Sequence, residues 1–215
     1  MDQYTFIIEN TRESTPYLCP EIRLRLVTES CPLWRAGEKD LAAHNLTDPY
    51  WAFCWAGGQA LARYLLDHPQ VVADKRVLDF GAGGGVVAIA AALSGAREIL
   101  AADIDPLTKE VIQINAQLNG VAITTTHDDL VGATVRGFEV VLAGDVCYDP
   151  EFAGKVIAWL RQIASSGIQV LIGDPGRGHL PDRGLMAVAT YRTPADTELT
   201  GKFLRNANVF ELVPD

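Results

Sequence analysis

A short glycine-rich run, Asp79-Phe-Gly-Ala-Gly-Gly-Gly85, carries the strongest chemical signal in this sequence. It follows an apolar segment, 77–80, and precedes an apolar, alanine-rich segment, 86–93, so we expect a buried strand, a loop and a helix in that order. Glycines such as Gly81 and Gly83 let the backbone turn sharply and approach a ligand where a Cβ atom would clash. Backbone N–H groups at the start of the helix point into the same space. The run predicts a nucleoside-binding loop, and a tight turn without a ligand is the alternative.

Acidic residues at the ends of successive predicted strands indicate which ligand this loop prefers. Asp79 lies inside the loop, where its carboxylate would repel the pyrophosphate of NAD. S-adenosylmethionine carries an ammonium and a sulfonium group and no phosphate, so Asp79 favours this cofactor, with S-adenosylhomocysteine as the product. Asp103 ends the next strand, where a carboxylate can accept hydrogen bonds from both ribose hydroxyls. Asp128, after the third strand, is expected to reach the adenine amino group, with a solvated loop acid as the alternative.

The fourth predicted strand, 140–143, ends in the polar run Gly144-Asp-Val-Cys-Tyr-Asp149. The carboxyl ends of strands in such sheets face the ligand crevice, so this run should lie beside the methyl donor. We place the reaction here, with Asp145, Tyr148 and Asp149 as catalytic residues. An acidic loop that only caps the following helix is the alternative.

An aromatic run, Tyr50-Trp-Ala-Phe-Cys-Trp55, precedes a predicted helix at 57–67. Aromatic faces attract cations by about 0.5–2 kcal/mol, depending on desolvation, and a sulfonium is a cation. The N-terminus of the helix can also receive a carboxylate. We therefore expect Trp55 to contact the cofactor, and ordinary core packing is the alternative.

The elements that must position these residues are strands that alternate with helices. Further strands are expected at 99–102, 123–126 and 170–172, and further helices at 107–118 and 152–163. This order predicts an α/β, Rossmann-like fold of seven strands, with a mostly parallel sheet and an antiparallel C-terminal strand. We divide one domain, 1–215, into an N-terminal appendage (1–50), a cofactor-binding core (51–180) and a C-terminal strand pair (181–215). The strands of that pair are 186–191 and 208–212, around a polar loop at 194–200. Within the appendage, 4–9 and 22–28 are short strands or helical turns.

Length and composition are those of one folded domain. The chain has 215 residues, of which 48% are hydrophobic and 21% are charged, a balance typical of globular proteins. Its net charge of −9 argues against a broad phosphate-binding surface, so no nucleic-acid partner is expected. The scattered cysteines and histidines predict no metal site. Because we find neither a secretion signal nor a long apolar segment, we expect a cytoplasmic protein with no membrane partner.

Five further runs match the motifs of a known family: Asp48-Pro-Tyr-Trp-Ala52, Gly57-Gly-Gln-Ala-Leu61, Ala102-Asp-Ile-Asp-Pro106, Gly144-Asp-Val-Cys-Tyr-Asp149 and Ile172-Gly-Asp-Pro-Gly-Arg177. With the glycine loop, they resemble the seven-strand, class I S-adenosylmethionine-dependent methyltransferases. Within that class, the chain is similar to the lysine methyltransferases of the electron transfer flavoprotein beta subunit. The resemblance implies methyl transfer to lysine ε-amines of that subunit. It also adds Ile104 and Gly144 to the expected cofactor contacts.

The chemistry implied by this resemblance depends mainly on orientation. A neutral lysine nitrogen must approach the methyl carbon in line with the departing sulfur, at about 3–3.5 Å. A carboxylate favours the charged form of a nearby lysine, so Asp145 and Asp149 are expected to dock and orient the amine while its proton leaves to water. Three rival functions stay open: a small-molecule amine N-methyltransferase on the same fold, an NAD(P)-binding oxidoreductase, and a protein that binds the cofactor without catalysis.

Overall fold

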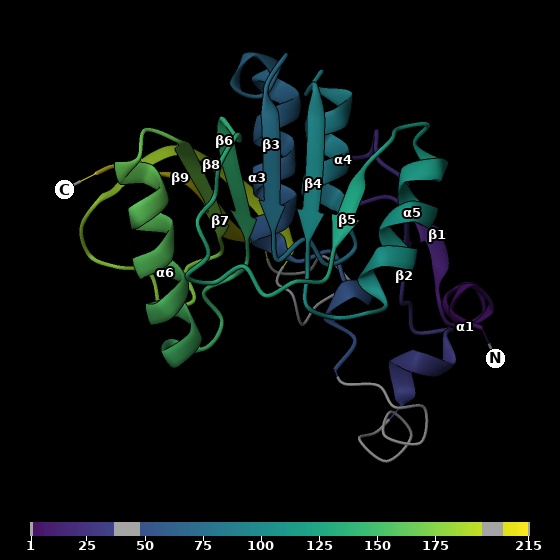
Figure 1. The fold of residues 1–215 in the computed structure, drawn as a ribbon. Coiled ribbons are helices and arrows are strands. Elements are labelled where there is room, and N and C mark those ends of the chain that lie inside the picture. Colours follow the sequence, from purple (N-terminus) through teal and green to yellow (C-terminus); the bar gives the residue numbers. More distant parts are fainter. Residues whose placement is uncertain (1, 37–47, 195–203, 215) are drawn as a thin grey trace.

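The computed structural model describes residues 2–36, 48–194 and 204–214, and its centre is a seven-stranded sheet (Figure 1). The strands follow the spatial order β5-β4-β3-β6-β7-β9-β8. Five neighbouring strands run parallel, and β9 is antiparallel to both β7 and β8, so the predicted fold class is confirmed. The strands are β3 (Arg76–Phe80), β4 (Glu98–Ala102), β5 (Thr124–Thr126), β6 (Val140–Gly144), β7 (Gln169–Asp174), β8 (Leu185–Pro194) and β9 (Leu204–Leu212).

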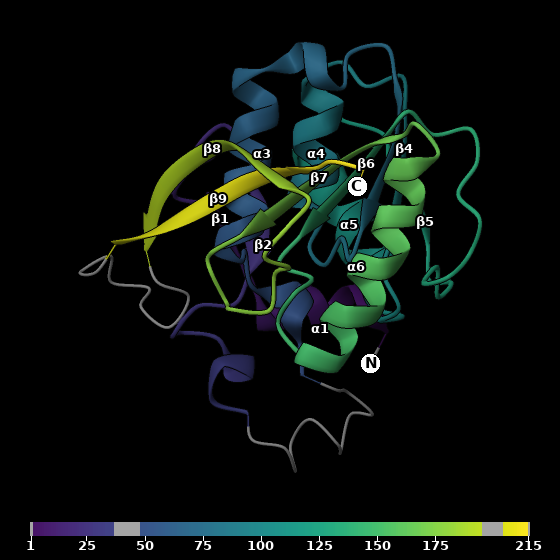
Figure 2. The same ribbon diagram turned by 90° about the vertical axis from the view of Figure 1, so that its left-hand side faces the viewer.

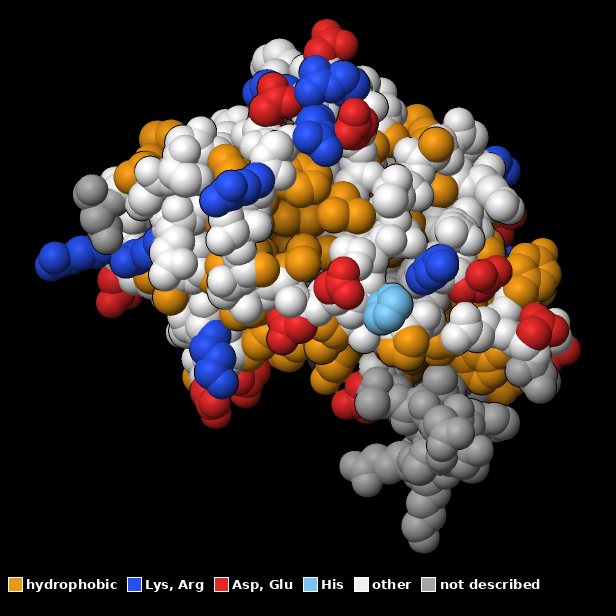
Figure 3. All heavy atoms as spheres, in the orientation of Figure 1, with side chains coloured by type: hydrophobic (Ala, Val, Ile, Leu, Met, Phe, Trp, Pro, Cys, Tyr) orange, Lys and Arg blue, Asp and Glu red, His pale blue; other side chains and the backbone are white. Residues whose placement is uncertain are grey.

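The chain order reverses at β3, which lies between β4 and β6. In α/β sheets, ligands bind at such a reversal, in the crevice outside the carboxyl ends of the strands. In Figure 1 this is the lower edge, toward which the arrows of β3, β4 and β6 point. Figure 3 shows acidic and hydrophobic side chains interspersed along the same edge.

Helices cover both faces of the sheet. The helices α3 (Ala56–Asp67) and α4 (Val86–Leu93) lie on one face, and α6 (Pro150–Ser165) lies on the other (Figures 1 and 2). The α4 sequence is apolar all round, and its first six residues are buried. In contrast, α6 is amphipathic, with buried residues at helical spacing from Ala153 to Ala164.

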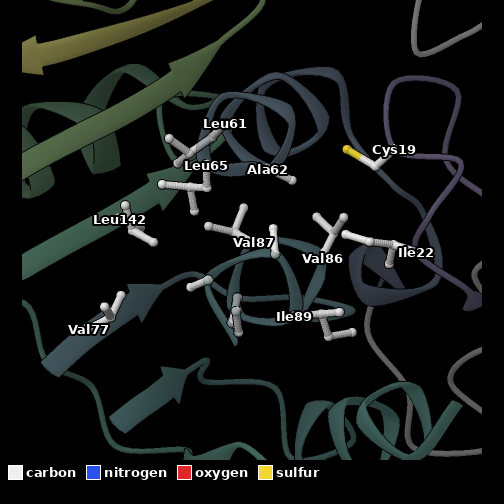
Figure 4. Close-up of a cluster of buried hydrophobic side chains, with 14 of the residues drawn as sticks. Cys19, Ile22, Leu61, Ala62, Leu65, Val77, Val86, Val87, Ile89 and Leu142 are labelled. Atoms are coloured by element: carbon white, nitrogen blue, oxygen red, sulfur yellow. The ribbon is translucent and has the colours of Figure 1, made fainter. Parts of the chain in front are cut away.

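The largest buried cluster joins α3 and α4 to the sheet. Leu61 and Leu65 of α3 face Val87 of α4, with Val77 of β3 and Leu142 of β6 beneath them (Figure 4). Burying a side chain of this size stabilises the folded state by about 1.5–3 kcal/mol relative to leaving it exposed. Their packing holds the N-terminal end of α3 over the carboxyl ends of the central strands.

Residues 2–36 and 48–53 pack beside α5 (Thr108–Leu118). The segment contains α1 (Gln3–Asn10), the strand pair β1 (Arg12–Ser14) and β2 (Leu24–Leu26), and the 3-10 helices η1 (Pro32–Arg35) and η2 (Tyr50–Ala52). Its apolar side chains form a third buried cluster with those of α5. Of the conformations left open by the sequence, 4–9 is helical and 22–28 contains a short strand. The division into 1–50, 51–180 and 181–215 stays a prediction.

Three elements, α6, β8 and β9, extend furthest beyond their predicted ranges. The predicted helix 152–163 begins earlier because the carboxylate of Asp149 accepts a hydrogen bond from Phe152 N (2.8 Å) and Pro150 takes the first helical position. The strands β8 and β9 are longer than predicted, because they pair with each other from Leu185–Leu212 to Pro194–Leu204. Pro194 ends β8, and the rest of the predicted loop lies outside the described residues. Among the helices described, none has the length and apolar character needed to cross a membrane.

Candidate active site

The loop between β3 and α4 presents its backbone to the crevice. Gly81 and Gly83 have positive φ angles of +68° and +50°, a region that side-chain-bearing residues rarely adopt. A Cβ atom on Gly84 would lie 2.9 Å from the carbonyl oxygen of Trp51. The loop therefore needs glycine both for its conformation and for its close contact with the aromatic segment that covers it.

Asp79 lies beneath this loop and is almost fully buried. Its Oδ2 accepts a hydrogen bond from Ala88 N (2.9 Å). Burial raises the pKa of this carboxyl to about 8, against the effect of the Ala88 bond, and the nearby Asp103 adds to the rise. At neutral pH, Asp79 is then largely protonated until a cation binds beside it. The negative charge inferred from the sequence thus becomes available when a ligand ammonium arrives.

Asp103 connects the end of β4 to the glycine loop. Its Oδ2 accepts a hydrogen bond from Gly83 N (2.8 Å), and its Oδ1 accepts one from Asp105 N (3.0 Å). Burial raises the pKa of Asp103, while these two bonds lower it. A carboxylate oxygen can accept more than one hydrogen bond, so both oxygens can still bind hydroxyl groups. The neighbouring side chain of Ile104 is exposed, and Asp105 accepts a hydrogen bond from Leu107 N just before α5.

The structure gathers six of the predicted residues around one cleft at the ends of β3 and β6. The cleft contains about 400 Å³ of space between atoms, part of it open to solvent, and Trp55, Asp79, Gly81, Gly83, Gly144 and Asp145 are among the residues that line it. The other five, Asp103, Ile104, Asp128, Tyr148 and Asp149, do not line it. Asp128 is exposed beyond β5, where it accepts a hydrogen bond from the Thr126 hydroxyl (2.7 Å).

Asp145 is the buried acid at the inner end of this cleft. Its backbone has a positive φ of +57°, and its side chain is 9% exposed. Its Oδ2 accepts a hydrogen bond from Gly58 N at the start of α3 (2.6 Å), and its Oδ1 forms an ion pair with Arg177 Nη2 (2.8 Å). The carboxylate that reaches this helix N-terminus in the structure is therefore that of Asp145.

Glycines allow α3 to approach the sheet closely enough for the Gly58 bond. A Cβ atom on Gly57 would lie 2.7 Å from the carbonyl carbon of Gly173 in β7, and one on Gly144 would lie 2.9 Å from Gly58 Cα. Sequence reasoning assigned no role to Gly57, Gly58 or Arg177. The available signals were the paired glycines at a predicted helix start and the Gly-Asp-Pro-Gly-Arg run that begins in the last two residues of β7.

An aromatic rim, formed by Tyr50, Trp55, Tyr148 and Phe152, borders the cleft. Ring centroids lie 6.0 Å apart between Tyr50 and Trp55, 5.8 Å between Tyr50 and Tyr148, and 5.7 Å between Tyr148 and Phe152. Tyr50 and Tyr148 are 53% and 52% exposed. Partial burial raises the pKa of Tyr148, so its hydroxyl stays protonated at neutral pH. The rim offers cation-attracting ring surfaces that a large partner can reach.

The remaining residues of the predicted reaction segment have structural contacts. Asp149 caps α6 through the hydrogen bond from Phe152 N, which is the contact expected for the capping alternative. Its catalytic role stays a prediction. Cys147 is buried, and burial raises the pKa of its thiol to about 12, so it is not a nucleophile at neutral pH.

Comparison with known proteins gives consistent matches. The family model of ribosomal protein L11 methyltransferase (PrmA) matches residues 59–144. The electron transfer flavoprotein beta subunit lysine methyltransferase of Xenopus laevis is 40% identical over 98% of this chain and 87% of its own length. The protein of the same name from Danio rerio is 42% identical over 90% of this chain and 76% of its own length.

A solved structure shows the same fold at low sequence identity. Magnesium protoporphyrin IX methyltransferase from Synechocystis PCC 6803, with bound S-adenosylmethionine, has a TM-score of 0.54 and 17% identity, covering 86% of this chain and 88% of that one. The cleft occupies the ligand position of such folds. The chain is thus an S-adenosylmethionine-dependent methyltransferase with a Rossmann-like fold, and it belongs to the family of the electron transfer flavoprotein beta subunit lysine methyltransferases.

Proposed function

We propose that this enzyme transfers methyl groups from S-adenosylmethionine to lysine side chains of the electron transfer flavoprotein beta subunit. The observation that carries the proposal is the identity of about 40% with enzymes of that name along nearly the whole chain. The cleft supports it, because a buried carboxylate and exposed aromatic rings stand together where the methyl group would be delivered.

The cleft fits the cofactor by its charge and by its backbone. When bound, S-adenosylmethionine supplies a methyl group on a positively charged sulfur. We assign the cofactor's amino end to Asp79, its ribose to Asp103 and its adenine to Asp128. The assigned contacts along the rest of the cofactor are Trp55, Gly81, Gly83, Ile104 and Gly144. Glycine conformation and close packing keep side chains out of this path.

The lysine would enter past the aromatic rim and meet Asp145. Asp145 binds and orients the incoming ammonium, and Tyr148 shapes the entrance. The ammonium loses one proton to water, and the nitrogen lone pair then forms the N–C bond. The C–S bond breaks, and its electron pair stays on sulfur. Asp149, at the entrance, contributes negative charge that attracts a basic segment.

Two observations favour this proposal over its rivals. A small-molecule amine methyltransferase would favour an enclosed pocket, whereas two tyrosines of the rim are about half exposed. The relatives that match nearly the whole chain are named lysine methyltransferases, which disfavours an NAD(P)-dependent oxidoreductase. Only a measurement of methyl transfer distinguishes the proposed enzyme from a protein that binds the cofactor without catalysis. The expected cytoplasmic location stays a prediction, which fractionation of cells producing the protein would measure.

The test is Asp145→Asn, with methyl incorporation into purified flavoprotein beta subunit measured by mass spectrometry. Asparagine tolerates the positive φ of this position and keeps an acceptor for Gly58 N, but it removes the charge. We expect turnover to fall tenfold or more, equivalent to about 1.4 kcal/mol, while cofactor affinity changes little.

Asp129→Asn is the matched control, because Asp129 is an exposed acid of the loop after β5 and loses the same charge. Equal losses of cofactor binding and turnover in Asp145→Asn would assign Asp145 to the cofactor site. Wild-type enzyme that leaves the beta subunit unmodified would refute the proposed substrate.

A further inference from the structure

Arg177 places a positive charge against the carboxylate that we assign to lysine orientation. Its Nη2 lies 2.8 Å from Asp145 Oδ1, and its guanidinium carbon lies 5.6 Å from the centre of the Trp55 ring. The Arg177 side chain is 22% exposed, so the ion pair is largely shielded from water. Shielding of this kind makes charge interactions stronger than at an open surface.

The loop after β7 is built to hold this arginine. Asp174, the last residue of β7, is fully buried, and its Oδ1 accepts hydrogen bonds from Gly176 N (2.6 Å) and Arg177 N (3.0 Å). Gly176 has a positive φ of +85°, which turns the chain back toward the cleft. The position of Arg177 is therefore determined by a buried side chain and a glycine turn.

A lone carboxylate would hinder the reaction that the cleft supports. A negative charge near a lysine raises the pKa of the amine and keeps it protonated. A protonated amine has no lone pair with which to attack the methyl carbon. A guanidinium stays charged at every pH at which the enzyme works. When it is paired with the carboxylate, its positive charge therefore offsets the rise that the carboxylate causes in the pKa of the amine.

We propose that Arg177 is a positioning residue that neutralises Asp145, so that the substrate lysine can lose its proton inside the cleft. The inference rests on the proposed function. Within residues 2–36, 48–194 and 204–214, the other titratable groups around this region are acids, one thiol and two phenols. They are Asp79 from β3, Asp103 after β4, Cys147, Tyr148 and Asp149 between β6 and α6, Asp174 from β7, and Tyr50 from η2. Those of the acids that are ionised would raise the pKa of the amine further. The positive charge of Arg177 opposes the combined effect of these negative charges.

The experiment measures kcat as a function of pH with the flavoprotein beta subunit and S-adenosylmethionine both saturating. Under these conditions, kcat reports the pKa of the bound lysine rather than that of the free substrate. In Arg177→Gln we expect the acidic limb to move upward by about one pH unit, which lowers turnover about tenfold at neutral pH and less at alkaline pH. In Arg177→Lys the acidic limb of the pH profile should stay at its wild-type position, because lysine keeps the positive charge.

A double variant and a control separate this role from a structural one. In Arg177→Gln combined with Asp145→Asn, both charges are absent, so the limb should return toward its wild-type position even though turnover stays low. Arg136→Gln, an exposed arginine in the loop before β6, controls for the change in net charge. Thermal unfolding and cofactor titration of each variant show whether the fold and the cofactor site persist.

The outcomes distinguish the two proposals. A uniform loss of kcat at all pH values in Arg177→Gln, with an unmoved limb, would overturn the role of Arg177 and leave the proposed function standing. An unchanged profile would do the same. Inactivity of the wild-type enzyme on the beta subunit would overturn the proposed function and, with it, this inference.

Discussion

The contact between α3 and β7 gives a sharp prediction for Gly57→Ala. The added methyl group would lie 2.7 Å from the Gly173 carbonyl carbon and 2.8 Å from Asp145 Oδ2, and closer still to the Gly173 carbonyl oxygen. Real Cβ atoms essentially never approach other atoms within 3.0 Å. Because β7 is an interior strand of the sheet, paired with β6 and β9, its backbone cannot yield easily, and the start of α3 must move away.

The cost of Gly57→Ala follows from two changes. Overpacking costs about 1–3 kcal/mol. Moving α3 also stretches the hydrogen bond from Gly58 N to the Asp145 carboxylate, and a bond to a charged group contributes about 1.5–3 kcal/mol. The higher helix propensity of alanine offsets about 1 kcal/mol. A net loss of about 3 kcal/mol in the free energy of unfolding should lower Tm by about 6–12 °C in a protein of this size.

Gly154→Ala is the matched control for this change. Gly154 lies in α6, is exposed, and has no atom within 4 Å of an added Cβ, so alanine there should stabilise the protein by up to about 1 kcal/mol. Urea and thermal unfolding of both variants measure the difference, and turnover of Gly57→Ala reports the displaced Asp145. If Gly57→Ala proves as stable as Gly154→Ala, the proposed close contact between α3 and β7 is wrong.

Three further predictions concern Asp79, Asp103 and the charge of the entrance. Burial raises the folded-state pKa of Asp79 to about 8, above the roughly 4 of an exposed aspartate, so the stability that its protonated form contributes is present below about pH 4 and is lost as the pH rises through 8. In Asp79→Asn this loss is absent, so the Tm of the variant minus that of the wild type should increase from pH 4 to pH 8. The variant should also bind the cofactor more weakly. A Tm difference that is constant with pH would contradict the burial of an ionisable group. Asp103→Ala should weaken cofactor binding by about 1–3 kcal/mol in calorimetry, and unchanged affinity would refute the ribose assignment. Added salt should slow methylation of the beta subunit more than it weakens cofactor binding, and equal sensitivity in the two assays would count against electrostatic docking.

Local sequence patterns determined the architecture of this protein. The glycine run between two apolar segments predicted the β3–loop–α4 unit, and the predicted helix 86–93 agrees with α4 at both ends. Such features depend on neighbouring residues, since glycine permits the turn and apolar periodicity selects strand or helix. The start of α6 was also encoded locally, in Asp149 and Pro150, but the apolar pattern alone placed it later. The positions of the acids at strand ends predicted that Asp79 and Asp145 would line one cleft, whereas Asp128, predicted in the same way, is exposed and does not line it.

Only the tertiary structure decided what Asp145 contacts and in which state Asp79 exists. The partners of Asp145 come from positions 87 and 32 residues away in sequence, and they meet it because β6 and β7 pair with Gly144 opposite Gly173 while glycines admit α3 beside them. Periodicity carries no information on such distant contacts, because a buried residue looks the same in sequence whichever element covers it. The pKa of Asp79 likewise depends on the depth at which packing places it. The sequence by itself thus predicted six of the residues that line the cleft, and packing across the sheet determined the partners of Asp145 and the pKa of Asp79.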